Sequence, residues 1–222
     1  MRTSRPLATL MLAAVLAIGA APAVVRADDP ATGATTYITY EAFPSPAQQP
    51  GEEDEIPKPL VKSLGNTKPS TPRAQRKSRG WGQVRFTKDM TKALIDFEIK
   101  GVDPADIIMF HIHCGPPGLL GPIIVDFGKK LGDLPTAFAK GKISVEITND
   151  DLTWASMFPP KGLPKGTVMP PETCPVEAGW PLTTKTIVGM EYLARRGLLY
   201  FNLHTKQHTY YGEVRGQLYL KQ

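Results

Sequence analysis

The 222-residue sequence has only two cysteines and four histidines, and after residue 25 it contains no further apolar run long enough to span a membrane. It also lacks a Ser-His-Asp arrangement, paired carboxylates, a phosphate-binding loop and a dinucleotide fingerprint. The glycine-rich stretch 115–121 is not a phosphate loop, because no Lys-Ser or Lys-Thr pair ends it and no helix follows it. These absences exclude the enzyme classes that such motifs identify and favour a non-catalytic protein.

Residues 1–27 have the features of a signal peptide. Arg2 and Arg5 precede an apolar run over 7–25, and Val25-Arg26-Ala27 is a small-x-small site of the kind that signal peptidase cleaves. Cleavage is predicted after Ala27, which makes the mature protein secreted or periplasmic, without a membrane span. An uncleaved anchor is the alternative.

The positive charge of the chain is concentrated in this leader. Its removal takes away three arginines and no acid, so the formal net charge falls from +5 to +2. That excess is too small to indicate a nucleic-acid partner. After a flexible N-terminus at 28–35, the remaining length is sufficient for a single domain over 36–222.

Short segments of alternating apolar and polar residues predict an antiparallel β structure. One helix is expected at 183–197, capped by Thr183 or Thr184 and ended by Gly197. Several short strands with a single helix predict an all-β fold, an antiparallel β-sandwich. The expected strands lie at 36–43, 83–86, 94–99, 110–114, 121–128, 140–148, 198–205 and 212–220.

Two segments interrupt this pattern. Residues 44–80 combine seven prolines with an acidic run and a basic cluster of Arg73, Arg76, Lys77 and Arg79, which predicts a low-complexity, solvated loop. Contact of the basic cluster with acidic lipid or polysaccharide is the alternative. Residues 149–182 are proline-rich and irregular, and are interpreted as an insertion.

The two cysteines, Cys114 and Cys174, are predicted to form a disulfide, as expected for an exported chain. The bond would close a loop of 60 residues, which corresponds to about 4 kcal/mol in the loop-entropy treatment. The alternative makes Cys114 a soft metal ligand beside His113.

Histidines provide the candidate site. His111 and His113 are two residues apart on one strand and therefore project from the same face. His204 lies on a later strand, on the face opposite Leu199, Phe201 and Leu203. If the two strands are neighbours, three imidazoles converge, a ligand set that suits copper or zinc. His208 in the next loop is a possible fourth ligand.

A structural role is the competing interpretation. Each histidine can instead donate a hydrogen bond to a carbonyl of the Gly-Pro turn or to Glu213, and so hold the loops without an ion. Glu213, Arg215 and Asn202 are candidate partners that orient the histidines, whereas a cross-strand polar ladder is the simpler role for Glu213 and Arg215. The turn residues are Gly115, Gly118, Gly121 and Pro122.

Three stretches, HIHCGPPGLLGPIIVDF, LLYFNLHT and GEVRGQL, resemble the CHRD domain, the module named after chordin. The resemblance spans about 36–222 and departs from the family pattern at Cys114, where glycine is usual. It implies an immunoglobulin-like sandwich and little about activity. In chordin the module belongs to an extracellular growth-factor antagonist.

Two functions follow as hypotheses. The first is a non-catalytic binding or structural module with a protein or matrix partner outside the cytoplasm. The second is a copper or zinc metalloprotein for storage, sensing or redox protection, since His-x-His on an exported sandwich also resembles copper-zinc superoxide dismutase.

Overall fold

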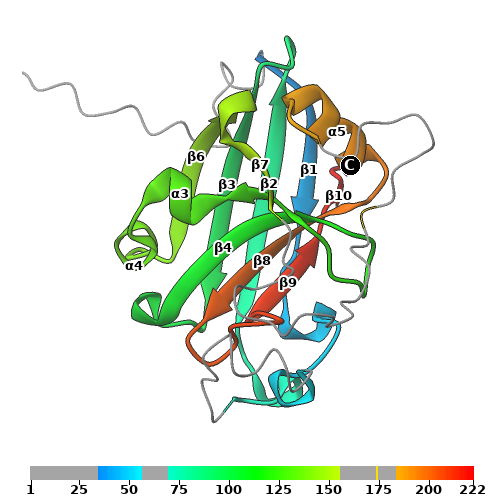
Figure 1. Cartoon of the computed structure of the whole chain (residues 1–222). Coiled ribbons are helices and arrows are strands. Elements are labelled where there is room, and N and C mark those ends of the chain that lie inside the picture. Colours follow the sequence, from blue (N-terminus) through cyan, green and yellow to red (C-terminus); the bar gives the residue numbers. More distant parts are fainter. Residues whose placement is uncertain (1–34, 57–69, 156–173, 175–183) are drawn as a thin grey trace, which may run out of the picture.

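Two antiparallel five-stranded sheets face each other, and their strands cross (Figure 1). The computed structural model describes residues 35–56, 70–155, 174 and 184–222. This arrangement confirms the predicted all-β sandwich. The first sheet has the order β10 (Tyr219–Leu220), β1 (Thr36–Ala42), β2 (Arg79–Thr87), β3 (Lys92–Lys100), β6 (Lys142–Thr148). The second has the order β7 (Leu152–Ala155), β5 (Ile123–Asp126), β4 (Ile107–Cys114), β8 (Leu199–Thr205), β9 (Val214–Gln217).

The core lies between the sheets and is built from the apolar half of each alternating strand. In the β2–β3 hairpin Val84 pairs with Ile95, and both side chains are buried as the alternation predicts. Aromatic rings from both sheets meet at Phe97, which lies 4.4 Å from Phe110 and 5.2 Å from Phe201 between ring centroids. This packing anchors β4 and β8 through their inner faces, and the side chains of the opposite face project from the same two strands.

The described part of the chain contains more α-helices than the single one predicted. The expected helix is α5 (Ile187–Arg195), but its N-cap is Thr186 rather than Thr183 or Thr184, because the extended Thr186 accepts a hydrogen bond from the Gly189 N–H. Two further short helices, α3 (Phe127–Leu131) and α4 (Leu134–Ala137), follow β5. Each begins at an aspartate cap and is too short to show a helical apolar period in the sequence.

The last predicted strand, 212–220, is in fact two strands. β9 pairs with β8 in the second sheet, whereas β10 pairs with β1 in the first. The buried Leu218 lies between them, where the chain passes from one sheet to the other. The C-terminal segment therefore links the two layers.

The segment 149–182 also differs from the prediction of an irregular insertion. It begins with a 3-10 turn, η5 (Asn149–Asp151), and with β7, which pairs with β5. The rest of the predicted insertion, 156–173 and 175–182, lies outside the described residues, as do the predicted signal peptide and most of the flexible N-terminus. Within the part of the chain that is described, no helix has the length and apolar character needed to cross a membrane.

The predicted solvated loop 44–80 is ordered at both of its described ends. Three 3-10 turns, η1 (Pro46–Gln48), η2 (Glu53–Glu55) and η3 (Arg73–Gln75), occur there, and η1 packs beside β9. Arg73 and Arg76 both pair with Glu52, at 2.9 and 3.1 Å, and Arg76 is buried. The interpretation of a solvated basic cluster is therefore wrong for Arg76, which is buried, whereas the Arg73 side chain stays partly exposed beside the same carboxylate.

Candidate metal centre

The two strands that contain the candidate histidines, β4 and β8, are direct neighbours. His111 lies opposite Asn202, and His113 lies opposite Tyr200. Since side chains alternate along a strand, Phe110 and Phe201 face the core while the histidines project from the other face of the sheet. That outer face is buried as well, since every residue of β8 is buried. Polar side chains are thus enclosed on the side of the sheet that usually faces water.

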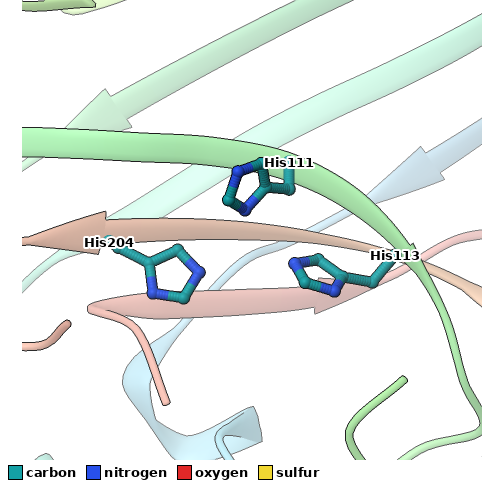
Figure 2. A group of neighbouring side chains, drawn as sticks. All are labelled: His111, His113 and His204. Atoms are coloured by element: carbon teal, nitrogen blue, oxygen red, sulfur yellow. The ribbon is translucent and has the colours of Figure 1, made fainter. Parts of the chain in front are cut away.

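His111, His113 and His204 come together on this face. One ring nitrogen from each lies within 4.8 Å of the others. Figure 2 shows the two rings from β4 and the one from β8 turned toward a common space. Their exposed fractions are 5%, 0% and 2%, respectively. The convergence predicted from strand alternation is present, in a nearly closed site.

Backbone carbonyls orient two of the three rings. The Nδ1 of His113 lies 2.9 Å from the Gly121 carbonyl oxygen, and the Nδ1 of His204 lies 3.0 Å from that of Thr209. A carbonyl can only accept, so each Nδ1 carries the hydrogen and each Nε2 is left with a lone pair. The Gly-Pro turn therefore does support His113, as the structural interpretation expected. Gly121 is required at this point, because a Cβ there would lie 1.7 Å from the Cys114 carbonyl oxygen.

Three of the four remaining ring nitrogens have no hydrogen-bond partner among the described residues. These are Nε2 of His113, Nε2 of His204 and Nδ1 of His111, all buried. The other nitrogen of His111 lies 3.8 Å from a carboxylate oxygen of Asp126. Two of the three are bare acceptors, which cannot hydrogen-bond one another. Buried polar atoms are rarely left unpaired, so three of them gathered in one place call for an explanation.

Burial also keeps the imidazoles neutral. Loss of solvation, with a smaller contribution from the Lys129 charge, lowers the pKa of His111 to about 4. Loss of solvation and the neighbouring His111 lower the pKa of His204 to about 3, and burial holds the pKa of His113 well below its ordinary value. Neutral imidazole is the form that binds metal ions.

The donor set fits a transition metal. Ligands at 2.0–2.1 Å around a tetrahedral ion lie about 3.4 Å apart, so the three nitrogens, each within 4.8 Å of the others, need only a small inward movement. Three imidazoles suit copper or zinc, whereas calcium and magnesium prefer oxygen ligands. His111, His113 and His204 are the residues that would hold such an ion.

The predicted fourth ligand, His208, is engaged elsewhere. Its Nδ1 contacts the Glu213 carboxylate, and its Nε2 lies 3.0 Å from the Thr71 carbonyl oxygen. The structure therefore does not bring its ring nitrogens to the other three histidines. Cys114 is not a ligand either, because it forms the predicted disulfide with Cys174.

The three predicted orienting residues are near the site but do not hydrogen-bond its rings in the described structure. Asn202 accepts from Gln49 and donates to the Tyr211 carbonyl. Glu213 accepts from Ser78 and pairs with His208. Arg215 lies with its Cζ 3.5 Å from the centroid of the Tyr200 ring.

Sequence reasoning missed Tyr200, whose ring stacks on that of His113 at 5.0 Å and 9°. The signal was available, because alternation places Tyr200 on the same face as Asn202 and His204. The carbonyls of Gly121 and Thr209 were also missed as specific partners, since they belong to loops whose path depends on tertiary packing.

Comparison with known proteins gives one match. The family model described as the CHRD domain matches residues 63–218, which includes both histidine strands and the C-terminal Gly-Glu-Val-Arg-Gly-Gln-Leu segment. No curated protein matches, and no solved structure matches.

Proposed function

The chain belongs to the CHRD domain family, and we propose that it is a non-catalytic module that holds one copper or zinc ion outside the cytoplasm. One observation carries the proposal: three buried imidazole nitrogens, from His111, His113 and His204, face one another and have no hydrogen-bond partner among the described residues. A metal ion satisfies all three at once, because each nitrogen supplies a lone pair to the same point.

The surrounding residues prepare the rings for this role. The carbonyls of Gly121 and Thr209 hold His113 and His204 in the tautomer with a free Nε2. Burial keeps the rings unprotonated, so the ion does not have to displace protons at neutral pH. The bound ion would supply a fixed positive charge that joins β4 to β8.

The enclosure of the site favours retention of an ion over turnover of a substrate. His111 is the most exposed of the three side chains, and its exposed fraction is only 5%. A redox enzyme needs its substrate to reach the metal, whereas storage or structural stabilisation does not. The closed site therefore favours a protein that holds a metal ion over one with superoxide-dismutase-like activity.

A purely structural module with a protein or matrix partner is the second candidate. It is favoured by the hydrogen bonds of His113 and His204, which already anchor two loops to the sheet. It leaves the three unpartnered nitrogens unexplained. The two candidates differ in what they predict for His111, whose one polar contact outside the histidine group, among the described residues, is the long one with Asp126.

Elemental analysis of tag-free protein tests the proposal. We expect one equivalent of copper or zinc in the native protein, and a loss of affinity greater than 100-fold in His111→Leu. Because Leu removes an unpaired buried nitrogen, we expect the metal-free variant to be no less stable than the metal-free native protein.

His208→Asn is the matched control, since it changes a buried histidine that lies outside the group. It should still bind one equivalent of metal, with at most the 10- to 100-fold loss of affinity expected for a residue that helps to position the His204 loop, even if its stability falls. Two results together would contradict the proposal and support the structural module: native protein that stays metal-free when supplied with either ion, and a His111→Leu variant that is less stable than the native protein.

A further inference from the structure

The positively charged Arg215 is separated from the proposed ligand His113 by one aromatic ring, that of Tyr200. The guanidinium of Arg215, on β9, stacks on one face of Tyr200, and the imidazole of His113 stacks on the Tyr200 ring. The distances are 3.5 Å from the Arg215 Cζ to the ring centroid and 5.0 Å between the Tyr200 and His113 ring centroids. Arg215, Tyr200 and His113 thus form a single stack that ends at a proposed ligand.

This charge is not neutralised locally. The hydrogen bonds of Arg215 go to the carbonyl oxygens of Leu119 and Pro116, at 2.7 and 2.8 Å, and to the Gln217 side-chain oxygen at 3.2 Å. All three acceptors are neutral, and in the described parts of the chain no carboxylate pairs with this guanidinium. Arg215 is 1% exposed and remains charged at any physiological pH. Water and salt therefore screen it weakly.

The charge acts on His113. The guanidinium lies on the Tyr200 ring that stacks on His113, in a buried position where a charge acts over a longer distance than it does in water. A field that opposes a proton on this ring also opposes a metal ion beside it. The repulsion is proportional to the charge of the ion, so a divalent ion experiences twice the repulsion of a monovalent one.

The negative charge nearest the site does not cancel this effect. Asp126 lies 3.8 Å from His111, but its other carboxylate oxygen lies 3.7 Å from the ammonium group of Lys129. It also accepts the backbone N–H groups of Gly128 and Lys129 as the cap of α3. Lys129 therefore offsets part of the Asp126 charge, whereas the described partners of Arg215 are all neutral.

We infer that Arg215 is a specificity-determining residue, which makes the three-histidine site prefer monovalent copper to divalent zinc or copper(II). The inference rests on the proposed metal-holding function. Arg215 acts through the Tyr200 ring and does not touch the ion. Its contribution is to penalise the second positive charge of a divalent ion.

The test compares the ratio of zinc(II) to copper(I) dissociation constants, because a ratio is insensitive to a general weakening of the site. Copper(I) is maintained with ascorbate, and both constants are measured by competition with a chelator. Arg215→Gln removes the charge and keeps a donor for one of the carbonyls. We expect the ratio to fall about tenfold, with zinc binding tightened relative to copper.

The reduction potential of the copper-loaded protein gives an independent readout. A tenfold change in relative affinity for copper(I) and copper(II) corresponds to 59 mV for one electron, so Arg215→Gln should lower the potential by about that amount. Arg215→Lys keeps the charge and should stay within about threefold of the native ratio. Arg195→Met removes an exposed arginine of α5 and should leave both readouts unchanged.

The outcomes separate the two proposals. Native protein that binds neither ion overturns the metal-holding function. Native protein that binds metal through the three histidines, but whose ratio and potential do not change in Arg215→Gln, overturns only the role of Arg215. Tighter binding of zinc(II) than of copper(I) by the native protein also overturns that role, whether or not the variants fold.

Discussion

The metal-free protein is expected to lose most of its unfolding free energy between pH 6.5 and pH 5. In the unfolded chain the three histidines take up protons near their ordinary pKa of about 6.5. In the folded protein burial lowers the pKa of His111 to about 4 and that of His204 to about 3, and it holds that of His113 well below its ordinary value. The unfolded state therefore binds more protons in this range, and stability decreases as the pH falls.

The size of the effect follows from the same linkage. At pH 5, a histidine that protonates only when unfolded destabilises the fold by about 2 kcal/mol, so three such residues approach the whole stability of an ordinary domain. Carboxylates whose folded pKa is lowered, such as Glu213, affect stability mainly below this window. Glu53, whose pKa burial raises, acts in the opposite direction: its contribution is fully present below its ordinary pKa of 4.5 and is lost as the pH rises through its raised folded value.

Urea denaturation at pH 7, 6 and 5, with and without metal, measures this dependence. His111→Leu lacks one of the three groups, and its stability should therefore fall by about a third less over the same range. A bound ion blocks protonation of the folded rings and should move the loss of stability to the pH at which the metal dissociates. Constant stability of the metal-free protein from pH 7 to pH 5 would show that the rings are not held neutral by burial.

The sequence was sufficient to predict which histidines share a face, because that placement depends only on the alternation of side chains along each strand. Alternation along β4 and β8 decides which side chains share a face, and the Cys114–Cys174 pairing follows from compartment and number. The neighbour relation of the two strands was an assumption, and the register of His111 with Asn202 supports it.

The sequence did not predict what covers that face. The sequence pattern predicts polar loops before β2 and after β8. In the structure the two loops meet, because the carboxylate of Glu53 accepts from the backbone N–H groups of Tyr210, Tyr211 and Gly212, which are more than 150 residues away. Such contacts depend on the approach of distant irregular segments, for which no periodic pattern exists. His208 and Glu213 were interpreted as site residues for the same reason: their pairing with each other is visible only in three dimensions.

Glu213 lies at the centre of a second buried polar group, beside the histidine site. One carboxylate oxygen accepts from the Ser78 hydroxyl, and the other contacts the Nδ1 of His208. Arg76 donates to the backbone carbonyl of Glu213 at 3.1 Å. Hydrogen bonds and nearby positive charge outweigh burial and hold the pKa of Glu213 below its usual range. These contacts join the segment that follows η3 to the 206–213 loop, which supplies the Thr209 carbonyl to His204.

Replacing Glu213 with alanine is therefore expected to cost about 3–5 kcal/mol of unfolding free energy, as for the loss of one partner of a buried ion pair. It should also weaken metal binding about 10- to 100-fold, because the loop that orients His204 loses its anchor.

Glu213→Gln keeps an acceptor for Ser78 and should cost less than half as much unfolding free energy. Glu146→Ala, on the exposed face of β6, should change stability by less than about 0.5 kcal/mol. Chemical denaturation and metal competition on the same samples measure both effects. An alanine variant with native stability would show that the buried pair contributes nothing to the fold, and one with reduced stability but native affinity would show that Thr209 holds His204 without help from Glu213.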